Sequence, residues 1–408
     1  MMSERPLIQG ILDTDFYKLT MAQAYLHQTP KAEAEWEFKC RSEEDLSLYV
    51  PELKAQVESF AEHTLSDQEF QYLRENFSFI SDDYLQWLKQ FRYQPELLSI
   101  EARNGQLVVS GKGPQLQVSP FEIPLMAALS EIRNRHRYPQ ISPEHIEQAT
   151  NRKIKSLERM GDTVDLSGFR FADFGTRRRF SFAAQQQIIA QLQQQLPEHF
   201  VGTSNPLLAK QFNLACIGTM AHEWFQTHQQ LGYQLADSQR AALENWITEY
   251  KDDLGIALTD IIGIDAFCRD LNRRLASNYS GFRHDSGDPI LWGEAILTKL
   301  EALQVDPSNK TLVFSDGLNF ERAVSIYQHF NGRIGLSFGI GTWLMGDLGL
   351  NQPMNMVMKM VRLNGHPVAK ISDSPGKTMC RDRAFLKSLM KVFAVNSTTR
   401  NAVLAQLN

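Results

Sequence analysis

Short apolar runs of this chain end in peptides whose side chains could do chemistry. The run at 169–172 is followed by Asp173 to Arg179, which ends in three arginines, and the run at 214–217 is followed by Gly218 to Glu223, which contains His222. Guanidinium groups can clamp carboxylate or phosphate oxygens. A histidine beside a carboxylate can serve as a nucleophile or a general acid/base. Both residue types therefore suit chemistry on an anionic ligand.

Three other peptides offer small residues, backbone N–H groups and hydroxyls. They are Gly202-Thr203-Ser204, Ser315-Asp316-Gly317 and Gly339-Ile340-Gly341-Thr342. Such peptides bind phosphate where they begin a helix, although glycine also ends strands for conformational reasons alone. Three of them at comparable positions favour a phosphorylated ligand.

Aspartates supply a candidate cation site. Asp285 and Asp288 follow one apolar run and Asp316 follows another, and divalent cations in phosphate chemistry bind carboxylate oxygens. Each candidate alone also has an ordinary interpretation. An aspartate often caps a helix, three arginines are common on a solvated surface, and a histidine such as His222 is often a satisfied structural residue.

The elements that must position these side chains are buried parallel strands, which are short and continuously apolar. We expect strands at 169–172, 199–201, 214–217, 279–282, 311–314 and 335–338. In α/β barrels the peptides after the carboxyl ends of the strands converge on one face. We therefore place the chemistry on that face.

The N-terminal part has a different, antiparallel pattern. Strict alternation of apolar and charged residues over 32–40 predicts a half-buried strand, and Asn104-Gly105 and Asn364-Gly365 predict hairpin turns. The capping box Ser66/Glu69 predicts a helix start. Helices are expected at 15–28, 51–63, 68–76, 82–91, 185–195 and 383–393, with a helical stretch over 120–161.

These patterns predict an α/β protein with two domains. A single core stops growing at roughly 250–300 residues, and the chain has 408. We place a mixed α/β N-terminal domain at 1–140 and a domain of alternating strands and helices, which contains most of the candidate residues, at 141–408. The tail from about 355 to 408 is expected to pack on the first domain.

Composition narrows the class of function. The net charge is −5, and the basic residues form small clusters spread along the chain, which argues against nucleic acid as a partner. No apolar run reaches the ~18 residues of a membrane helix, so we expect no membrane partner and a cytoplasmic location. The four cysteines form no C-x-x-C pair, which is typical of reduced thiols.

Two nucleotide-binding motifs fail. Gly376-Lys377-Thr378 resembles the end of a P-loop, but the first glycine of that motif would fall on Ile371. No G-x-G-x-x-G follows an expected strand, so dinucleotide binding of the Rossmann kind is unsupported.

The chain resembles a known family, the nicotinate phosphoribosyltransferases, most closely those of bacteria. Five segments carry the likeness in the same order along nearly the whole chain: 11–21 (ILDTDFYKLTM), 173–178 (DFGTRR), 202–205 (GTSN), 218–223 (GTMAHE) and 314–317 (FSDG). The resemblance implies a mixed α/β N-terminal domain and, as the catalytic domain, an irregular TIM-like (β/α) barrel of the type II phosphoribosyltransferase kind. It also implies a dimer with shared active sites.

The implied reaction joins nicotinate to phosphoribosyl pyrophosphate and gives nicotinate mononucleotide and pyrophosphate, in NAD salvage. In the family this ligase-type transfer is coupled to ATP hydrolysis through a phosphohistidine, and Mg²⁺ is a further cofactor. By resemblance His222 is the phosphorylated residue and Glu223 its neighbour that tunes it. Asp285 is an acid that contacts the ribose or the metal, and a metal would meet Asp285 or Asp316 through substrate phosphates.

The resemblance also implies the ligand contacts. Phe174 and, from the partner subunit, Tyr17 resemble the aromatic pair that sandwiches the pyridine ring. The implied contacts of the nicotinate carboxylate and the substrate phosphates are Arg177 and Arg283. The 5′-phosphate cradle is implied at Ser315, Asp316, Gly317, Gly339, Gly341 and Thr342, and pyrophosphate contacts are implied at Arg41 and Lys359.

Four alternatives stay open at this point. Nicotinamide phosphoribosyltransferases are similar but have an aspartate where this chain has Ser204, and a hydroxyl near arginines suits an acid better. Quinolinate phosphoribosyltransferases are shorter and lack the 220–223 motif. The others are a catalytically inactive homologue and an unrelated barrel enzyme that acts on sugar phosphates.

Overall fold

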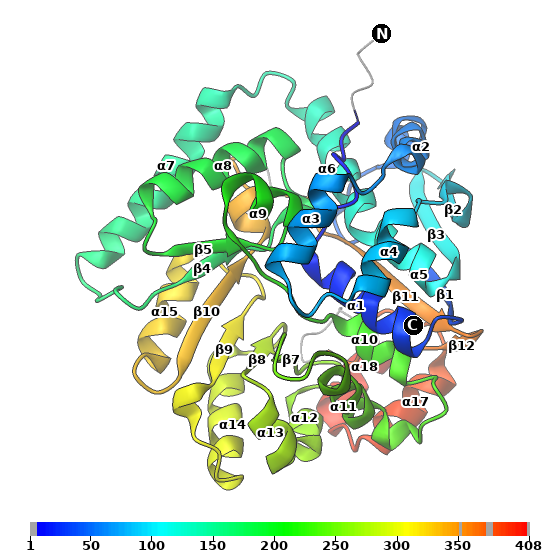
Figure 1. Cartoon of the computed structure of the whole chain (residues 1–408), viewed down its shortest axis with the longest axis vertical. Helices are drawn as coiled ribbons and strands as arrows, with labels where there is room; N and C mark the ends of the chain where they lie inside the picture. Colours follow the sequence, from blue (N-terminus) through cyan, green and yellow to red (C-terminus); the bar gives the residue numbers. More distant parts are fainter. Residues whose placement is uncertain (1–5, 351–352, 373–377, 406–408) are drawn as a thin grey trace. The chain divides into compact units, whose positions relative to one another are not determined.

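The computed structural model describes residues 6–350, 353–372 and 378–405 (Figure 1). It forms two compact units. Unit 1 comprises residues 1–218, 317–321 and 339–358, and unit 2 comprises 219–316, 322–338 and 359–408. The domain limits near residue 140 and the packing of the tail stay predictions. Gly376 and Lys377 of the rejected P-loop lie outside the described residues.

Unit 1 begins with helices and an antiparallel sheet and continues with parallel strands. Its elements are α1 (Phe16–Gln28), β1 (Glu33–Cys40), α2 (Val50–Ser59), α3 (Asp67–Asn76), α4 (Asp82–Gln90), β2 (Leu98–Arg103), β3 (Gln106–Pro114), α5 (Gln115–Val118), α6 (Glu122–Arg137), α7 (Pro143–Gly161), β4 (Phe171–Asp173), α8 (Phe182–Gln195), β5 (Phe200–Thr203), α9 (Pro206–Phe212), β6 (Ala215–Cys216) and α16 (Thr342–Met345).

The antiparallel part of unit 1 confirms the alternation and turn predictions. Strands β1, β3 and β2 are neighbours in that order. The β2–β3 turn has Asn104 at φ 50° and Gly105 at φ 71°, the positive dihedrals that a type I′ hairpin needs. At the start of α3 the Ser66 side chain accepts from the Glu69 N–H and the Glu69 side chain accepts from the Ser66 N–H, so the predicted capping box is present.

The parallel strands of unit 1 follow the order β6-β5-β4 and then the last residues of β10 (Gly335–Ile340). The N–H of Phe174 donates to the carbonyl of Ile340 at 3.0 Å. Helix α8 starts at its cap Ser181, one turn earlier than the expected 185. In Figure 1, α8 and α9 lie beside β4 and β5.

Unit 2 continues the alternation of strands and helices. Its elements are α10 (His222–His228), α11 (Ser238–Tyr250), β7 (Ile256–Leu258), α12 (Ile264–Asp270), α13 (Arg273–Asn278), β8 (Gly281–His284), α14 (Pro289–Ala302), β9 (Thr311–Phe314), most of α15 (Phe320–Phe330), the first part of β10, the last part of β11 (Met356–Leu363), β12 (His366–Pro367), α17 (Arg383–Val392) and α18 (Ser397–Ala405).

The strands of unit 2 are parallel in the order β10-β9-β8-β7. Together with unit 1 they confirm the predicted α/β class. Strand β8 runs to His284, two residues beyond the expected end at 282, because Arg283 and His284 pair with Val313 and Phe314 of β9. Arg283 therefore lies on the strand and not after it. Strand β7 was not predicted.

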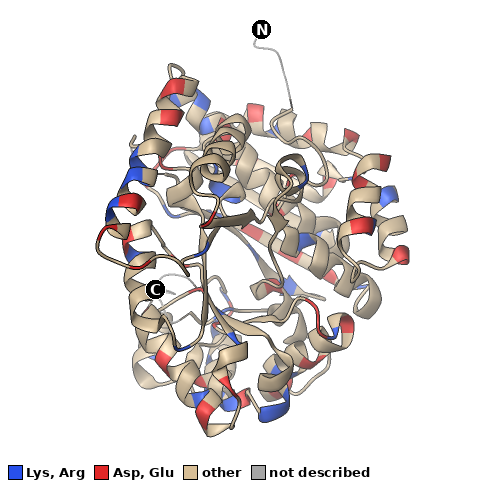
Figure 2. Cartoon of the chain, turned by 60° about the vertical axis from the view of Figure 1, so that its left-hand side comes forward, with Lys and Arg blue, Asp and Glu red and all other residues tan. Residues whose placement is uncertain are grey.

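Basic and acidic residues both occur along many of the helices, where Figure 2 colours them blue and red. The searched helices include none that combines the length and the apolar character needed to cross a membrane. That search covers the described part of the chain.

Candidate active site

His222 begins helix α10 in unit 2, and its imidazole meets a carboxylate that the sequence alone did not predict. The Nε2 atom lies 2.7 Å from Oδ1 of Asp260, and both side chains are almost fully buried. Asp260 comes two residues after β7. The end of that strand is fixed by Thr259, whose hydroxyl donates to the carbonyl of Arg283 at 3.0 Å and accepts from the Trp292 indole at 2.8 Å.

Asp260 is also held from its other oxygen. The Ser286 hydroxyl and the Lys370 ammonium both donate to Oδ2, each at 2.6 Å. Burial alone would raise the pKa of Asp260, but the positive charge of Lys370 and the contact with His222 hold it well below its usual range. Asp260 is therefore an ionised carboxylate that accepts three hydrogen bonds.

The charge state of His222 follows from this environment. Burial lowers the pKa of the imidazole to about 4, with Lys370 acting in the same direction, so the ring is neutral at pH 7. Because ionised Asp260 can only accept, the proton of the neutral ring is on Nε2. The lone pair of Nδ1 is then available, and a neutral imidazole nitrogen is a nucleophile.

Asp285 follows β8 and lies in the same cluster. Its Oδ2 is 3.7 Å from His222 Nε2 and 3.7 Å from Lys370 Nζ, and the Ser315 hydroxyl lies 3.3 Å from its Oδ1. The structure thus brings together His222, Asp285 and Ser315. Asp288 caps α14 by accepting from the N–H groups of Ile290 and Leu291, which is the ordinary capping role.

His222, Asp260 and Asp285 are residues of types that bind metal ions. One ligand atom from each lies within 4.8 Å of the others, which is close enough for a shared ion. The Lys370 ammonium already donates to one of these carboxylates and lies close to the other. A divalent cation chelated there would face that positive charge at short range. As it stands, the triad does not fit an added divalent metal.

In unit 1 the three consecutive arginines have three different roles. Arg179 is fully buried and pairs through both terminal nitrogens with Asp13, at 2.6 and 2.8 Å. Arg178 donates to the carbonyl of Met356. The Arg177 side chain is 31% exposed, and its NH1 lies 3.9 Å from Glu122. Arg178 is half-buried as well, but its guanidinium already donates to a backbone carbonyl, so Arg177 is the better candidate for a ligand-binding arginine.

Ser204, at the end of β5, is bound to the start of α1. Its hydroxyl donates to Asp15 at 2.7 Å, and its carbonyl accepts from the Phe16 N–H at 2.7 Å. Burial raises the pKa of Asp15 to about 7, against the opposing effects of the Ser204 hydrogen bond and the charge of Arg177. Two acidic side chains, Asp15 and Glu122, thus contribute to the electrostatic environment of Arg177.

Phe174 follows β4 and is tightly packed by Gly339 of β10 and by Gly341, which follows that strand. A Cβ on Gly339 would lie 2.2 Å from the Phe174 ring, and one on Gly341 would lie 2.7 Å from the Phe174 carbonyl oxygen. Real Cβ atoms do not approach so closely, so both glycines are needed for the approach of Phe174. Phosphate binding is not required to explain them. Thr342, which begins α16, accepts a long hydrogen bond of 3.4 Å from Arg178.

The other predicted residues are distributed over both units. Unit 1 contains Tyr17 on α1, Arg41 just after β1 and Gly317, which has φ 59°. Unit 2 contains Glu223 on α10, Arg283 on β8, Asp316 after β9 and Lys359 on β11.

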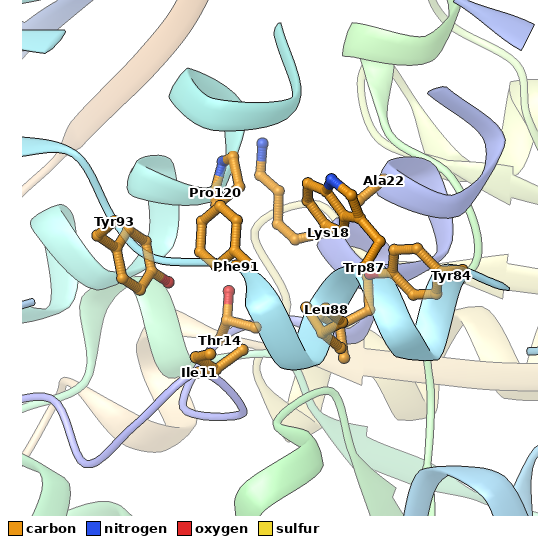
Figure 3. A pocket seen from close by; sticks show the side chains of 11 residues that line it. Ile11, Thr14, Lys18, Ala22, Tyr84, Trp87, Leu88, Phe91, Tyr93 and Pro120 are labelled. Carbon is orange, nitrogen blue, oxygen red and sulfur yellow. The ribbon is translucent and has the colours of Figure 1, made fainter. Parts of the chain in front are cut away.

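A small pocket in unit 1 is not a substrate site (Figure 3). Its volume is about 20 Å³, and most of its lining is apolar. A single water needs about 10–15 Å³ of such space. The hydroxyls of Thr14 and Tyr84 in the lining are buried and have no hydrogen-bond partner in the described structure. The pocket has room for about one water.

Asp260 and Lys370 are the functional candidates that the sequence alone did not reveal. The run Ile256-Ala257-Leu258 followed by Thr259-Asp260 repeats the apolar-then-polar pattern of the other strands, so that pattern could have found Asp260. Lys370 follows the short strand β12 and has no such signal. Only the folded chain shows that it contacts Asp260.

The fold and the site define an α/β protein with candidate ligand groups after the carboxyl ends of parallel strands. Comparison with known proteins is more specific. The model of the nicotinate phosphoribosyltransferase family matches residues 169–397, and the model of the N-terminal domain of that family matches 12–130.

Individual relatives cover nearly the whole chain. Nicotinate phosphoribosyltransferase 2 of Pseudomonas aeruginosa is 49% identical over 96% of this chain and 98% of its own. The nicotinate phosphoribosyltransferase of Serratia proteamaculans is 48% identical over 95% of this chain and 96% of its own length. A crystal structure of the Vibrio cholerae nicotinate phosphoribosyltransferase has a TM-score of 0.94 and 36% sequence identity. The match covers 99% of this chain and 97% of the Vibrio cholerae chain. The chain belongs to the nicotinate phosphoribosyltransferase family, and the predicted fold class is confirmed.

Proposed function

We propose that the chain forms nicotinate mononucleotide and pyrophosphate from nicotinate and phosphoribosyl pyrophosphate, coupled to ATP hydrolysis through a phosphohistidine at His222. The observation that carries the reaction is the family match, which covers both parts of the chain at up to 49% identity among the relatives described above. The buried His222–Asp260 pair supports the coupling step.

Phosphoribosyl transfer needs no general base in this proposal. The pyridine nitrogen of nicotinate donates its lone pair to C1 of the ribose, and the C1–O bond to pyrophosphate breaks with its electron pair on the leaving group. Positive charge grows on the ribose and negative charge on the pyrophosphate, so cationic groups near the pyrophosphate stabilise the transition state most. Arg41 and Lys359 are the proposed groups.

Nicotinate binding is assigned to Tyr17, Phe174, Arg177, Ser204 and Arg283. The pyridine ring stacks on Phe174 and on Tyr17 of a partner chain, as suits a flat aromatic ligand. Arg177 receives the carboxylate, and the hydroxyl of Ser204 adds no negative charge there. Asp285 contacts the ribose, and the 5′-phosphate cradle comprises Ser315, Asp316, Gly317, Gly339, Gly341 and Thr342.

The coupling step uses the available lone pair of His222. Nδ1 attacks the γ-phosphorus of ATP, and the bond to the bridging oxygen breaks with its electron pair on ADP. The phosphorylated ring keeps its Nε2 proton and becomes cationic, so ionised Asp260 stabilises it as a carboxylate stabilises a catalytic imidazolium. Water later attacks this phosphorus, and the N–P electron pair returns to the ring as phosphate leaves.

Phosphorylation then acts on conformation. A phosphoryl group adds roughly two negative charges and new acceptor oxygens, and it favours the state that binds phosphoribosyl pyrophosphate. We further propose Mg²⁺ carried on the substrate phosphates, a homodimer with shared sites, and a role in NAD salvage in the cytoplasm.

Product analysis tests the reaction. Purified protein with nicotinate, phosphoribosyl pyrophosphate, ATP and Mg²⁺ should form nicotinate mononucleotide, as detected by chromatography and mass spectrometry. Nicotinamide in place of nicotinate should react far more slowly. Equal use of nicotinamide would favour the amide-specific alternative, and absence of product from both would favour an inactive homologue.

A further inference from the structure

The residues on either side of Lys370 are held in place through their backbone groups. The Ala369 N–H donates to the Gln229 side chain at 2.9 Å, and the Ala369 carbonyl accepts from the same side chain at 2.8 Å. The Ile371 N–H donates to the carbonyl of Ile261 at 2.7 Å. These bonds tie the segment to the end of α10 and to the peptide after Asp260. The backbone position from which the Lys370 side chain extends is therefore fixed, and its ammonium lies close to both carboxylates.

The ammonium lies where a metal would meet the acidic groups. Its nitrogen is 2.6 Å from Asp260 and 3.7 Å from Asp285, and the Lys370 side chain is only 11% exposed. Both oxygens of Asp260 already accept hydrogen bonds. Removing the ammonium would leave two carboxylates and an imidazole within 4.8 Å, a donor set typical of transition-metal sites.

We propose that Lys370 is a positioning residue: its ammonium is the resident cation of the His222–Asp260–Asp285 triad, excludes divalent metal from it, and holds Asp260 in the orientation that fixes the His222 ring. The inference deepens the proposed function and rests on it for the role of His222. A divalent ion that serves the reaction is then held elsewhere, with the substrate phosphates.

A purely structural role would look different. Lys310, also in unit 2, is such a lysine: its ammonium donates to the carbonyls of Ser277 and Tyr279 at 2.9 and 2.6 Å. Replacing Lys310 removes these hydrogen bonds but leaves Asp260 and Asp285 with their neutralising ammonium. Lys310→Met is therefore the matched control for Lys370→Met, and Lys370→Arg restores the charge at the site itself.

The first measurement is metal binding by the full chain without nucleotide, with Mn²⁺ titrated and the free ion followed by electron paramagnetic resonance. Lys370→Met should gain one Mn²⁺ per chain relative to the natural sequence, and adding Asp260→Asn should remove it. Lys370→Arg and Lys310→Met should gain none. If Lys370→Met gains no Mn²⁺, the resident-cation role is overturned.

The second measurement is transfer of ³²P from γ-labelled ATP to the protein. Lys370→Met should incorporate phosphate at least about tenfold more slowly, in line with the effect of losing groups that orient a ligating or catalytic histidine. Lys310→Met should match the natural chain. Unchanged incorporation in Lys370→Met would overturn the positioning role. Were Lys370→Met unfolded by circular dichroism, Lys370→Gln would take its place in both measurements.

Failure of the proposed function can be told apart from failure of the proposed role of Lys370. In that case the natural chain carries no phosphate on His222, whereas the Mn²⁺ titration still reports on Lys370.

Discussion

Asp260 determines which nitrogen of His222 carries the proton. The carboxylate accepts from Nε2 at 2.7 Å, and this leaves Nδ1 unprotonated. The proposed nucleophile, Nδ1 of His222, therefore depends on Asp260, a residue that does not itself react.

Asp260→Asn tests that dependence. The amide can donate to Nε2 and so move the ring proton to Nδ1, which would block attack on phosphate. We expect ATP-stimulated synthesis to fall by about 10²-fold or more. The measurement is the initial rate with and without ATP, with circular dichroism as the control for folding. Full ATP stimulation in the variant would contradict the assigned tautomer.

Asp15 makes the stability of the protein depend on pH. Burial raises its folded-state pKa to about 7, above the unfolded value near 3.9. Between these values the folded state binds more protons than the unfolded state, so stability falls as pH rises through this window. Below it both states are protonated and the group has no effect.

Asp15→Asn removes this term while keeping an acceptor for Ser204. From pH 4.5 to 7.5 the natural chain should lose on the order of 1–4 kcal/mol of unfolding free energy relative to the variant. Urea unfolding of both proteins at the two pH values measures the difference. Parallel pH profiles would show that Asp15 is not perturbed.

At the scale of elements, the end of β10 determines where the Phe174 ring lies. Gly339→Ala would place a methyl group on that ring, and overpacking typically costs ~1–3 kcal/mol. We expect a higher KM for nicotinate because the proposed stacking surface moves. Steady-state kinetics and thermal melting measure the two effects.

Gly161→Ala is the control for this substitution. Gly161 ends helix α7, and a Cβ there meets only an ordinary contact at 3.7 Å. This variant should keep both its KM and its stability. A normal nicotinate KM in folded Gly339→Ala would count against the role of Phe174.

Elements with strong local signals were predictable. The alternation of β1, the turn at Asn104-Gly105 and the capping box at Ser66 each follow from short-range chemistry. The end of β8 was not predictable, because Arg283 and His284 are strand through pairing with residues far away in the sequence, on β9 and, for Arg283, also on β7. Strand β7, with three residues, is too short to show a period.

In the candidate site, too, only residues with a local sequence signal could be predicted. His222 and Asp285 could be proposed from their positions after apolar runs, and the structure places them 3.7 Å apart. Lys370 is separated by 110 residues from the aspartate it contacts. Such contacts come from tertiary packing, which no local pattern encodes. Arg179 shows the converse, since a charged cluster typical of a surface contains a fully buried residue.

At the scale of the whole molecule, the proposed dimer predicts complementation. Tyr17→Ala and Phe174→Ala should each impair activity. A hybrid of the two variants has one site with both aromatic residues intact, so refolding them as an equal mixture should recover about a quarter of the natural activity in a symmetric dimer. Light scattering gives the oligomeric state. An impaired mixture that stays as weak as its parents would contradict shared sites.

The most direct test of the account is the ATP dependence of nicotinate mononucleotide synthesis in His222→Ala. The natural chain should be stimulated by ATP and carry an acid-labile, base-stable phosphate. The folded variant should carry none and show only slow transfer that ATP does not accelerate. Full ATP stimulation in His222→Ala would contradict the phosphohistidine mechanism.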